Sequence, residues 1–172
     1  LLMSNFQATL RAMLTHGYER LDALVGELNK LVMDRARGER FITLFIGVVD
    51  TRTGTMRYVN AGHNAPLLWR NDVLREMKDG CIALGMLPEL PFVKTGEAQL
   101  NGGMLLSYTD GLVEQEDIYG AAFDTGPLEK ALRQFSGAGP QAVNEALIAT
   151  FEAHRAGLPY LDDIALLTCR FS

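Results

Sequence analysis

The sequence predicts an α+β fold in which helices at both ends of the chain flank a run of short strands. Apolar residues near the start recur every three or four positions, whereas those in the middle alternate or form continuous β-branched runs. Near the end, two segments each open with a proline, as the first turn of a helix often does. Strands grouped between helices are typical of a layered α+β domain, and a length of 172 residues suits one domain over residues 1–172.

The first quarter of the chain favours two helices. From Leu2 as far as Leu14, apolar residues recur at helical spacing, and no capping residue precedes them. A break at His16-Gly17 separates this segment from a second, amphipathic helix. We expect the second helix to run from Tyr18 to Met33, with Asn29 on its polar face.

The strands are expected to begin after Gly38, where the helical pattern ends. The segment Phe41 to Asp50 is so continuously apolar and β-branched that it predicts a central strand buried on both faces. The turn residues 51–54 and the alternating segment Met56 to Asn60 then complete a hairpin, and the middle of the chain should form an antiparallel sheet. The other strands are expected at Pro66–Trp69, Val73–Met77, Phe92–Gln99, Met104–Tyr108 and Ile164–Phe171, and the last helices at Pro127–Phe135 and Pro140–His154.

Composition and charge argue against several classes of function. The net charge of -5 disfavours general nucleic-acid binding, which depends on Lys and Arg contacts with phosphates. No apolar run approaches the roughly 20 residues that a membrane-spanning helix needs. The two cysteines, Cys81 and Cys169, lack the spacing of a metal site and fit a reducing compartment. We therefore expect a cytoplasmic domain that contacts neither nucleic acid nor membrane.

Acidic residues at the ends of two predicted strands suggest a cation site. Asp110, next to Gly111, follows the strand that ends at Tyr108, and Asp162 and Asp163 precede the last strand. Divalent cations such as Mg²⁺ and Mn²⁺ prefer oxygen ligands, so carboxylates on rigid strand ends can hold them. The alternative is structural, because Asp-Gly is frequent in turns and a strand entrance is often solvated.

Five segments resemble, in order and spacing, the bacterial SpoIIE/RsbU-type serine phosphatases of the PP2C-like (PPM) superfamily. These segments are Phe41–Phe45, Asn60–Pro66, Leu84-Gly85, Tyr108–Glu114 and Asp162–Leu167. The resemblance implies a PP2C-like layered β-sandwich flanked by helices, and a metal-dependent protein serine/threonine phosphatase with two Mn²⁺ or Mg²⁺ ions. It also implies a phosphorylated anti-anti-sigma (STAS-type) protein as substrate, and an upstream sensory or receiver domain in the parent chain.

The resemblance assigns roles to individual residues. Asp110 and Asp162 match metal ligands, and Asp163 is a neighbouring residue that can act as an alternative ligand. The residues expected to support these ligands are Gly111, Asn60 and His63. His63 could also contact phosphate or act as an acid, but a histidine between glycine and asparagine more often stabilises a turn.

The family's first metal motif, an aspartate in a Gly-Asp-x-Ser-Gly-type turn before the first long helix, has no counterpart in this sequence. We expect it, with the family's first strands, to lie upstream of Leu1, so that the chain is an N-terminally truncated phosphatase domain that binds metal weakly or not at all. The competing hypothesis is a catalytically inactive, phosphatase-like module that binds a partner. A small-molecule sensor domain is a third, weaker reading. Apolar surface exposed by truncation suggests a homodimer.

Overall fold

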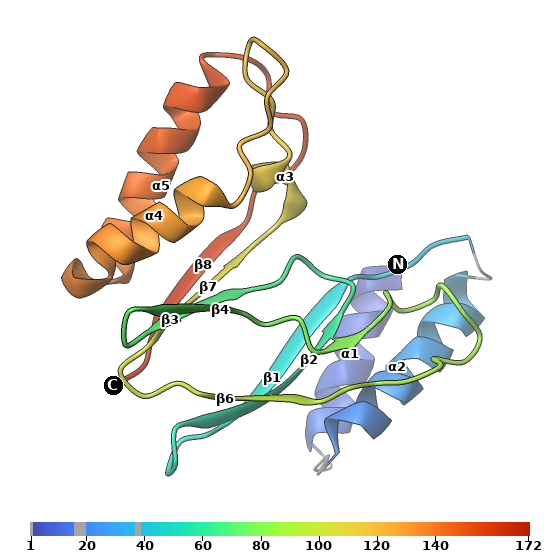
Figure 1. Ribbon diagram of the computed structural model, residues 1–172. Coiled ribbons are helices and arrows are strands. Elements are labelled where there is room, and N and C mark those ends of the chain that lie inside the picture. Colours follow the sequence, from blue (N-terminus) through green and yellow to red (C-terminus); the bar gives the residue numbers. More distant parts are fainter. Residues whose placement is uncertain (1, 16–19, 37–38) are drawn as a thin grey trace. The chain divides into compact units, whose positions relative to one another are not determined.

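A computed structural model describes residues 2–15, 20–36 and 39–172, which form two compact units (Figure 1). Unit 1 comprises Leu1–His63 and Lys78–Gln99, and unit 2 comprises Asn64–Met77 and Leu100–Ser172. Each unit has its own mixture of sheet and helices, which confirms the α+β class. That both units belong to a single domain stays a prediction.

Unit 1 packs two helices against a sheet whose central strand is β2. This strand pairs antiparallel with β1 and β6 and parallel with β5. Apolar side chains of the helices, such as Leu24 and Leu28, form one buried cluster with Val59 of β2 and with Leu84. The elements are α1 (Leu2–Thr15), α2 (Leu21–Ala36), β1 (Leu44–Asp50), β2 (Thr55–Ala61), β5 (Gly80–Cys81) and β6 (Gly96–Gln99).

Two predictions in unit 1 are wrong. Within the described residues β1 pairs only with β2 and is largely exposed or half-buried, so it is not a central strand buried on both faces. A continuous apolar run indicates a strand but not its place in a sheet. Asn29 was expected on a wet face, yet its exposure is 1% because its amide bonds the loop after Leu84. The expected break at His16-Gly17, the helix start at Tyr18 and the stop at Gly38 lie outside the described residues.

Unit 2 is an antiparallel sheet in the order β4-β3-β7-β8, with α4 and α5 packed against it. Alternate residues of β7, including Leu106 and Tyr108, enter a buried cluster with Leu132 of α4 and Phe151 of α5. Figure 1 shows both helices on the same side of β7 and β8. The elements are β3 (Leu67–Arg70), β4 (Val73–Glu76), β7 (Met104–Tyr108), α3 (Asp110–Val113), α4 (Gly126–Phe135), the short 3₁₀ helix η1 (Ser136–Ala138), α5 (Pro140–Arg155) and β8 (Leu166–Arg170).

The local predictions agree with most of these elements. The two proline-initiated helices, α4 and α5, begin and end within one residue of the expected bounds. The hairpin of β1 and β2 is confirmed, and Asp50 accepts hydrogen bonds from the backbone N–H groups of Arg52 and Thr53 in its turn. The single antiparallel sheet is a wrong prediction, because the strands form two sheets and β2 pairs parallel with β5. Among the described residues, no helix is long and apolar enough to span a membrane.

Candidate metal centre

Asp110 stands at the junction between β7 and α3. The backbone of Thr109 is extended, with φ -97° and ψ 162°, and α3 begins at the next residue. Asp110 is exposed, and its Oδ1 accepts a hydrogen bond of 3.0 Å from the N–H of Gly111. This contact is the turn interaction that the structural alternative predicts, but it occupies only one of the two carboxylate oxygens.

Thr109 joins this junction to the segment that precedes β8. Its N–H donates to the Ala165 carbonyl at 3.1 Å, and its Oγ1 accepts from the Ala165 N–H at 2.9 Å. The same hydroxyl donates to the Asp163 carbonyl at 3.2 Å. The end of β7 and the approach to β8 are therefore held together next to Asp110.

Gly111 packs closely against the second acidic segment. A Cβ atom at this position would lie 2.5 Å from the Asp163 carbonyl oxygen and 3.2 Å from the Asp162 carbonyl carbon. Only a residue without a side chain allows this packing. The fold thus brings the Asp110 turn against the main chain of Asp162 and Asp163, which are 52 and 53 residues further along the sequence than Asp110.

The three carboxylates can hold a hard cation by the chemistry of their oxygens, and all three residues are exposed. Asp162 Oδ1 accepts a hydrogen bond of 2.7 Å from the Asp163 N–H. Across residues 2–15, 20–36 and 39–172, however, no group of three or more His, Cys, Asp or Glu side chains is arranged so that it could hold a metal ion. The assignment of Asp110, Asp162 and Asp163 as ligands stays a prediction.

Asn60 and His63 lie in unit 1, whereas Asp110, Gly111, Asp162 and Asp163 lie in unit 2. The buried Asn60 side chain accepts a hydrogen bond of 2.8 Å from the His63 N–H, across a turn in which Gly62 has φ +66°. The Nδ1 atom of His63 lies 3.2 Å from the Thr43 hydroxyl. These contacts favour the turn-stabilising interpretation of His63.

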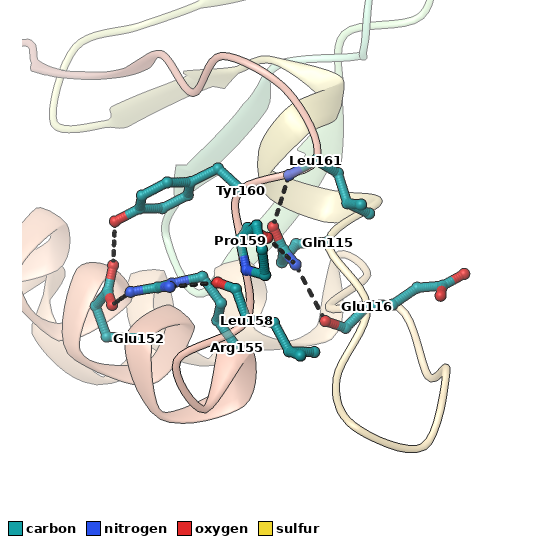
Figure 2. A network of polar contacts seen from close by, with 8 residues as sticks. All are labelled: Gln115, Glu116, Glu152, Arg155, Leu158, Pro159, Tyr160 and Leu161. Carbon is teal, nitrogen blue, oxygen red and sulfur yellow. Dashed lines mark hydrogen bonds and ion pairs between the residues drawn. The ribbon is translucent and has the colours of Figure 1, made fainter.

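Sequence reasoning missed Gln115, which is 1% exposed although it directly follows the exposed Glu114. Figure 2 shows its side chain between Glu116 and the segment from Leu158 to Leu161. No local pattern marks this residue, because two of its three side-chain hydrogen bonds join a segment more than 40 residues away in the sequence.

An apolar groove of about 390 Å³ lies beside the two later aspartates. Residues of α5 and of the approach to β8 form most of its lining, and Asp162 and Asp163 contribute its acidic side. The lining residues are Leu112, Leu147, Ile148, Phe151, Glu152, Tyr160, Asp162, Asp163, Ile164 and Leu166.

Solved structures of PP2C-type phosphatase domains have the same fold. The SiaA-PP2C domain of Pseudomonas aeruginosa matches with a TM-score of 0.78 and 22% identity over 97% of this chain and 69% of that chain. The PP2C domain of SpoIIE from Bacillus subtilis, solved with a fragment of its regulatory domain, gives 0.79 and 18% over 99% and 49%. The RsbU and RsbW domains of Rv1364c from Mycobacterium tuberculosis give 0.74 and 25% over 97% and 46%.

The fold is therefore that of a PP2C-type serine phosphatase domain. The family described as Stage II sporulation protein E (SpoIIE) matches residues 1–172, so the chain belongs to the SpoIIE family. Protein IcfG of Synechocystis sp. is 35% identical over 75 residues, which is 43% of this chain. The chain spans 12% of IcfG and about half of the matched Rv1364c and SpoIIE chains.

Proposed function

We propose that this chain forms part of a metal-dependent protein serine/threonine phosphatase whose cation site uses Asp110, Asp162 and Asp163. The observation that supports it most is the contact of Gly111 with the main chain of Asp162 and Asp163, in a chain of the SpoIIE family. Mn²⁺ or Mg²⁺, when bound there, supplies an acidified water and neutralises phosphoryl oxygens, and the protein needs no nucleophile of its own.

The chain's own residues contribute position and charge. Asp110 is fixed by the start of α3, and Thr109 holds the approach to β8 beside it. The apolar groove next to Asp162 and Asp163 gives a surface for a protein substrate, because it can bury an apolar side chain near the site.

The proposed substrate is a phosphorylated anti-anti-sigma (STAS-type) protein. The family resemblance supports this substrate, and so does the similarity to a solved structure that contains RsbU and RsbW domains. An upstream sensory or receiver domain, a homodimer and a cytoplasmic location belong to the same proposal. The free thiols Cys81 and Cys169 agree with a reducing compartment.

The test is phosphate release from a phosphoserine-containing STAS protein by the full-length protein that includes this chain. We expect release with Mn²⁺ or Mg²⁺, loss of release with a chelator, and loss of most activity in Asp110→Asn. Glu129→Gln, which changes an exposed carboxylate on α4, is the matched control and should keep the wild-type rate.

A catalytically inactive, partner-binding module is the second candidate. It is favoured by one observation: within the described residues, no group of three or more His, Cys, Asp or Glu side chains is arranged so that it could hold a metal ion. Binding of the STAS protein by the full-length protein with no phosphate release at any Mn²⁺ concentration would support this module and contradict the phosphatase.

A further inference from the structure

Gln115 is a buried polar side chain, and a buried amide is costly unless its donors and acceptor are hydrogen-bonded. It comes directly after Glu114, the C-cap residue of α3, and five positions after Asp110. Its backbone is also held, since Nε2 of His154 lies 3.1 Å from the Gln115 carbonyl and 3.0 Å from the Ala121 carbonyl.

The amide of Gln115 bonds the segment that leads to Asp162. Nε2 donates to the Pro159 carbonyl at 3.3 Å and to the Glu116 carbonyl at 3.1 Å, and Oε1 accepts from the Leu161 N–H at 3.2 Å (Figure 2). Both carbonyls can only accept and the N–H can only donate, so the chemistry of the partners fixes the orientation of the amide.

A second set of contacts joins the same segment, which leads to Asp162, to helix α5. Arg155 of α5 donates to the Leu158 carbonyl and to Glu152, and Glu152 accepts a hydrogen bond of 2.8 Å from the Tyr160 hydroxyl (Figure 2). The Arg155 guanidinium also lies over the Tyr160 ring, 4.4 Å from its centroid. These contacts join the segment to α5, whereas the Gln115 side chain joins it to the residues that follow α3.

Asp162 therefore lies between two anchor points that belong to one short stretch of chain. On its N-terminal side Gln115 holds the Leu161 N–H, and on its C-terminal side Thr109 holds the Asp163 carbonyl and the Ala165 N–H. Asp110 lies between Thr109 and Gln115 in the sequence. The stretch that carries one acidic residue thus also sets the position of the other.

We propose that Gln115 is a positioning residue for the metal centre, which holds Asp162 in register with Asp110 so that both carboxylates can reach one cation. The inference rests on the proposed function and names a residue that controls the same site. Side chains that orient metal ligands typically change metal affinity about 10- to 100-fold when they are replaced. Displacements of about 1 Å at a catalytic site can have a similar effect on rate.

The test uses Gln115→Met in the full-length protein, because methionine keeps the length of the side chain and removes all three hydrogen bonds. The matched control is Gln141→Met, since Gln141 is an exposed amide on α5 that bonds Glu145. Mn²⁺ affinity is measured by electron paramagnetic resonance, phosphate release is measured over a range of Mn²⁺ concentrations, and melting is followed without metal.

We expect Gln115→Met to weaken Mn²⁺ binding at least fivefold, within the range typical of residues that orient ligands, and excess Mn²⁺ to restore much of the rate. Gln141→Met should match the wild type. A change in Mn²⁺ affinity of less than fivefold overturns the proposal, whatever happens to the melting temperature. If Gln115→Met does not fold, Leu161→Pro is measured in its place, since it removes the N–H donor to Gln115 and also fixes φ at an exposed residue, and the same criterion applies.

Asp110→Asn separates this inference from the proposed function. If that variant keeps wild-type Mn²⁺ affinity and phosphate release, the phosphatase assignment itself is wrong. If Asp110→Asn loses both properties while Gln115→Met keeps them, the metal centre stands and only the role of Gln115 is wrong.

Discussion

Gly111 lies so close to Asp163 that a methyl group on its Cα would come within 2.5 Å of the Asp163 carbonyl oxygen. Gly111→Ala should therefore push the Asp162–Asp163 main chain away from the start of α3. We expect the melting temperature to fall, as for an overpacked site that costs about 1–3 kcal/mol, and metal-dependent phosphate release to fall with it.

Gly137→Ala is the matched control for this substitution, because Gly137 is exposed in η1 and no atom beyond its chain neighbours and its own helix backbone lies within 4 Å of the position that its Cβ would take. It should leave both stability and phosphate release close to wild type. A Gly111→Ala variant that behaves like Gly137→Ala would contradict the tight packing of the two acidic segments.

In unit 1, the buried amide of Asn29 joins a helix to a distant loop. Its Nδ2 donates to the carbonyls of Leu87 at 3.0 Å and Pro88 at 3.3 Å, and its Oδ1 accepts from the Gly85 N–H at 2.9 Å. Asn29→Leu should destabilise the protein by about 1–3 kcal/mol because buried polar groups lose their partners. Urea unfolding measures this change, and Lys30→Ala on the exposed side of α2 should shift stability by less than about 0.5 kcal/mol.

Replacing Gly26 by alanine, in the same helix, should stabilise the protein. Gly26 lies within α2, and no atom beyond its chain neighbours and the nearby backbone of α2 lies within 4 Å of the place its Cβ would take. Gly26→Ala should raise the free energy of unfolding by about 0.5–1 kcal/mol, since alanine loses less backbone entropy in a helix. Gly85→Ala should do the opposite, because Gly85 has φ +86° and its Cβ would lie 2.5 Å from Val32 Cγ1. Equal effects of the two substitutions in urea unfolding would refute this reasoning.

The carboxyl group of Asp117, in the loop after Gln115, should make the stability of the protein depend on pH. Hydrogen bonds from the N–H groups of Ala121 and Tyr119, at 2.9 Å and 2.8 Å, hold the pKa of this carboxyl below its ordinary value of 3.8. Its contribution to stability is therefore present above pH 3.8 and is lost as the pH falls through the lowered pKa.

The measurement is the difference in melting temperature between the wild type and Asp117→Asn, followed from about pH 6 down to about pH 3. We expect the wild type to be the more stable at the upper end and the difference to shrink at the lower end. A difference that grows as the pH falls, or a carboxyl pKa at or above 3.8 by NMR, would show that the loop does not stabilise the charged form.

Local signals in the sequence predicted the elements that local interactions determine. The prolines that open α4 and α5 give their starts almost to the residue, and the alternating segment after the 51–54 turn gives the hairpin. Acidic residues at two strand ends suggested one cation site; β7 and β8 are neighbours in one sheet, and Gly111 packs against the main chain of Asp162 and Asp163, but the ligand set stays a prediction.

What the sequence could not predict depends on partners far along the chain. Gln115 and Asn29 look like ordinary polar residues, yet both are buried and their amides bond loops more than 40 residues away. The exposure of β1 could not be predicted either, because the neighbours of a strand are set by topology and not by its own composition.

The central claim is that Asp110 and Asp162 bind the same cation. A double-mutant cycle of Asp110→Asn, Asp162→Asn and the double variant, with Mn²⁺ affinity of the full-length protein as the readout, tests it most directly. The claim predicts that the double variant binds Mn²⁺ little more weakly than the worse single variant, with a coupling energy above about 0.5 kcal/mol. A shared site would be contradicted if the losses of Mn²⁺-binding free energy in the two single variants added up, to within about 0.5 kcal/mol, to the loss in the double variant. Single variants with wild-type affinity would also contradict it.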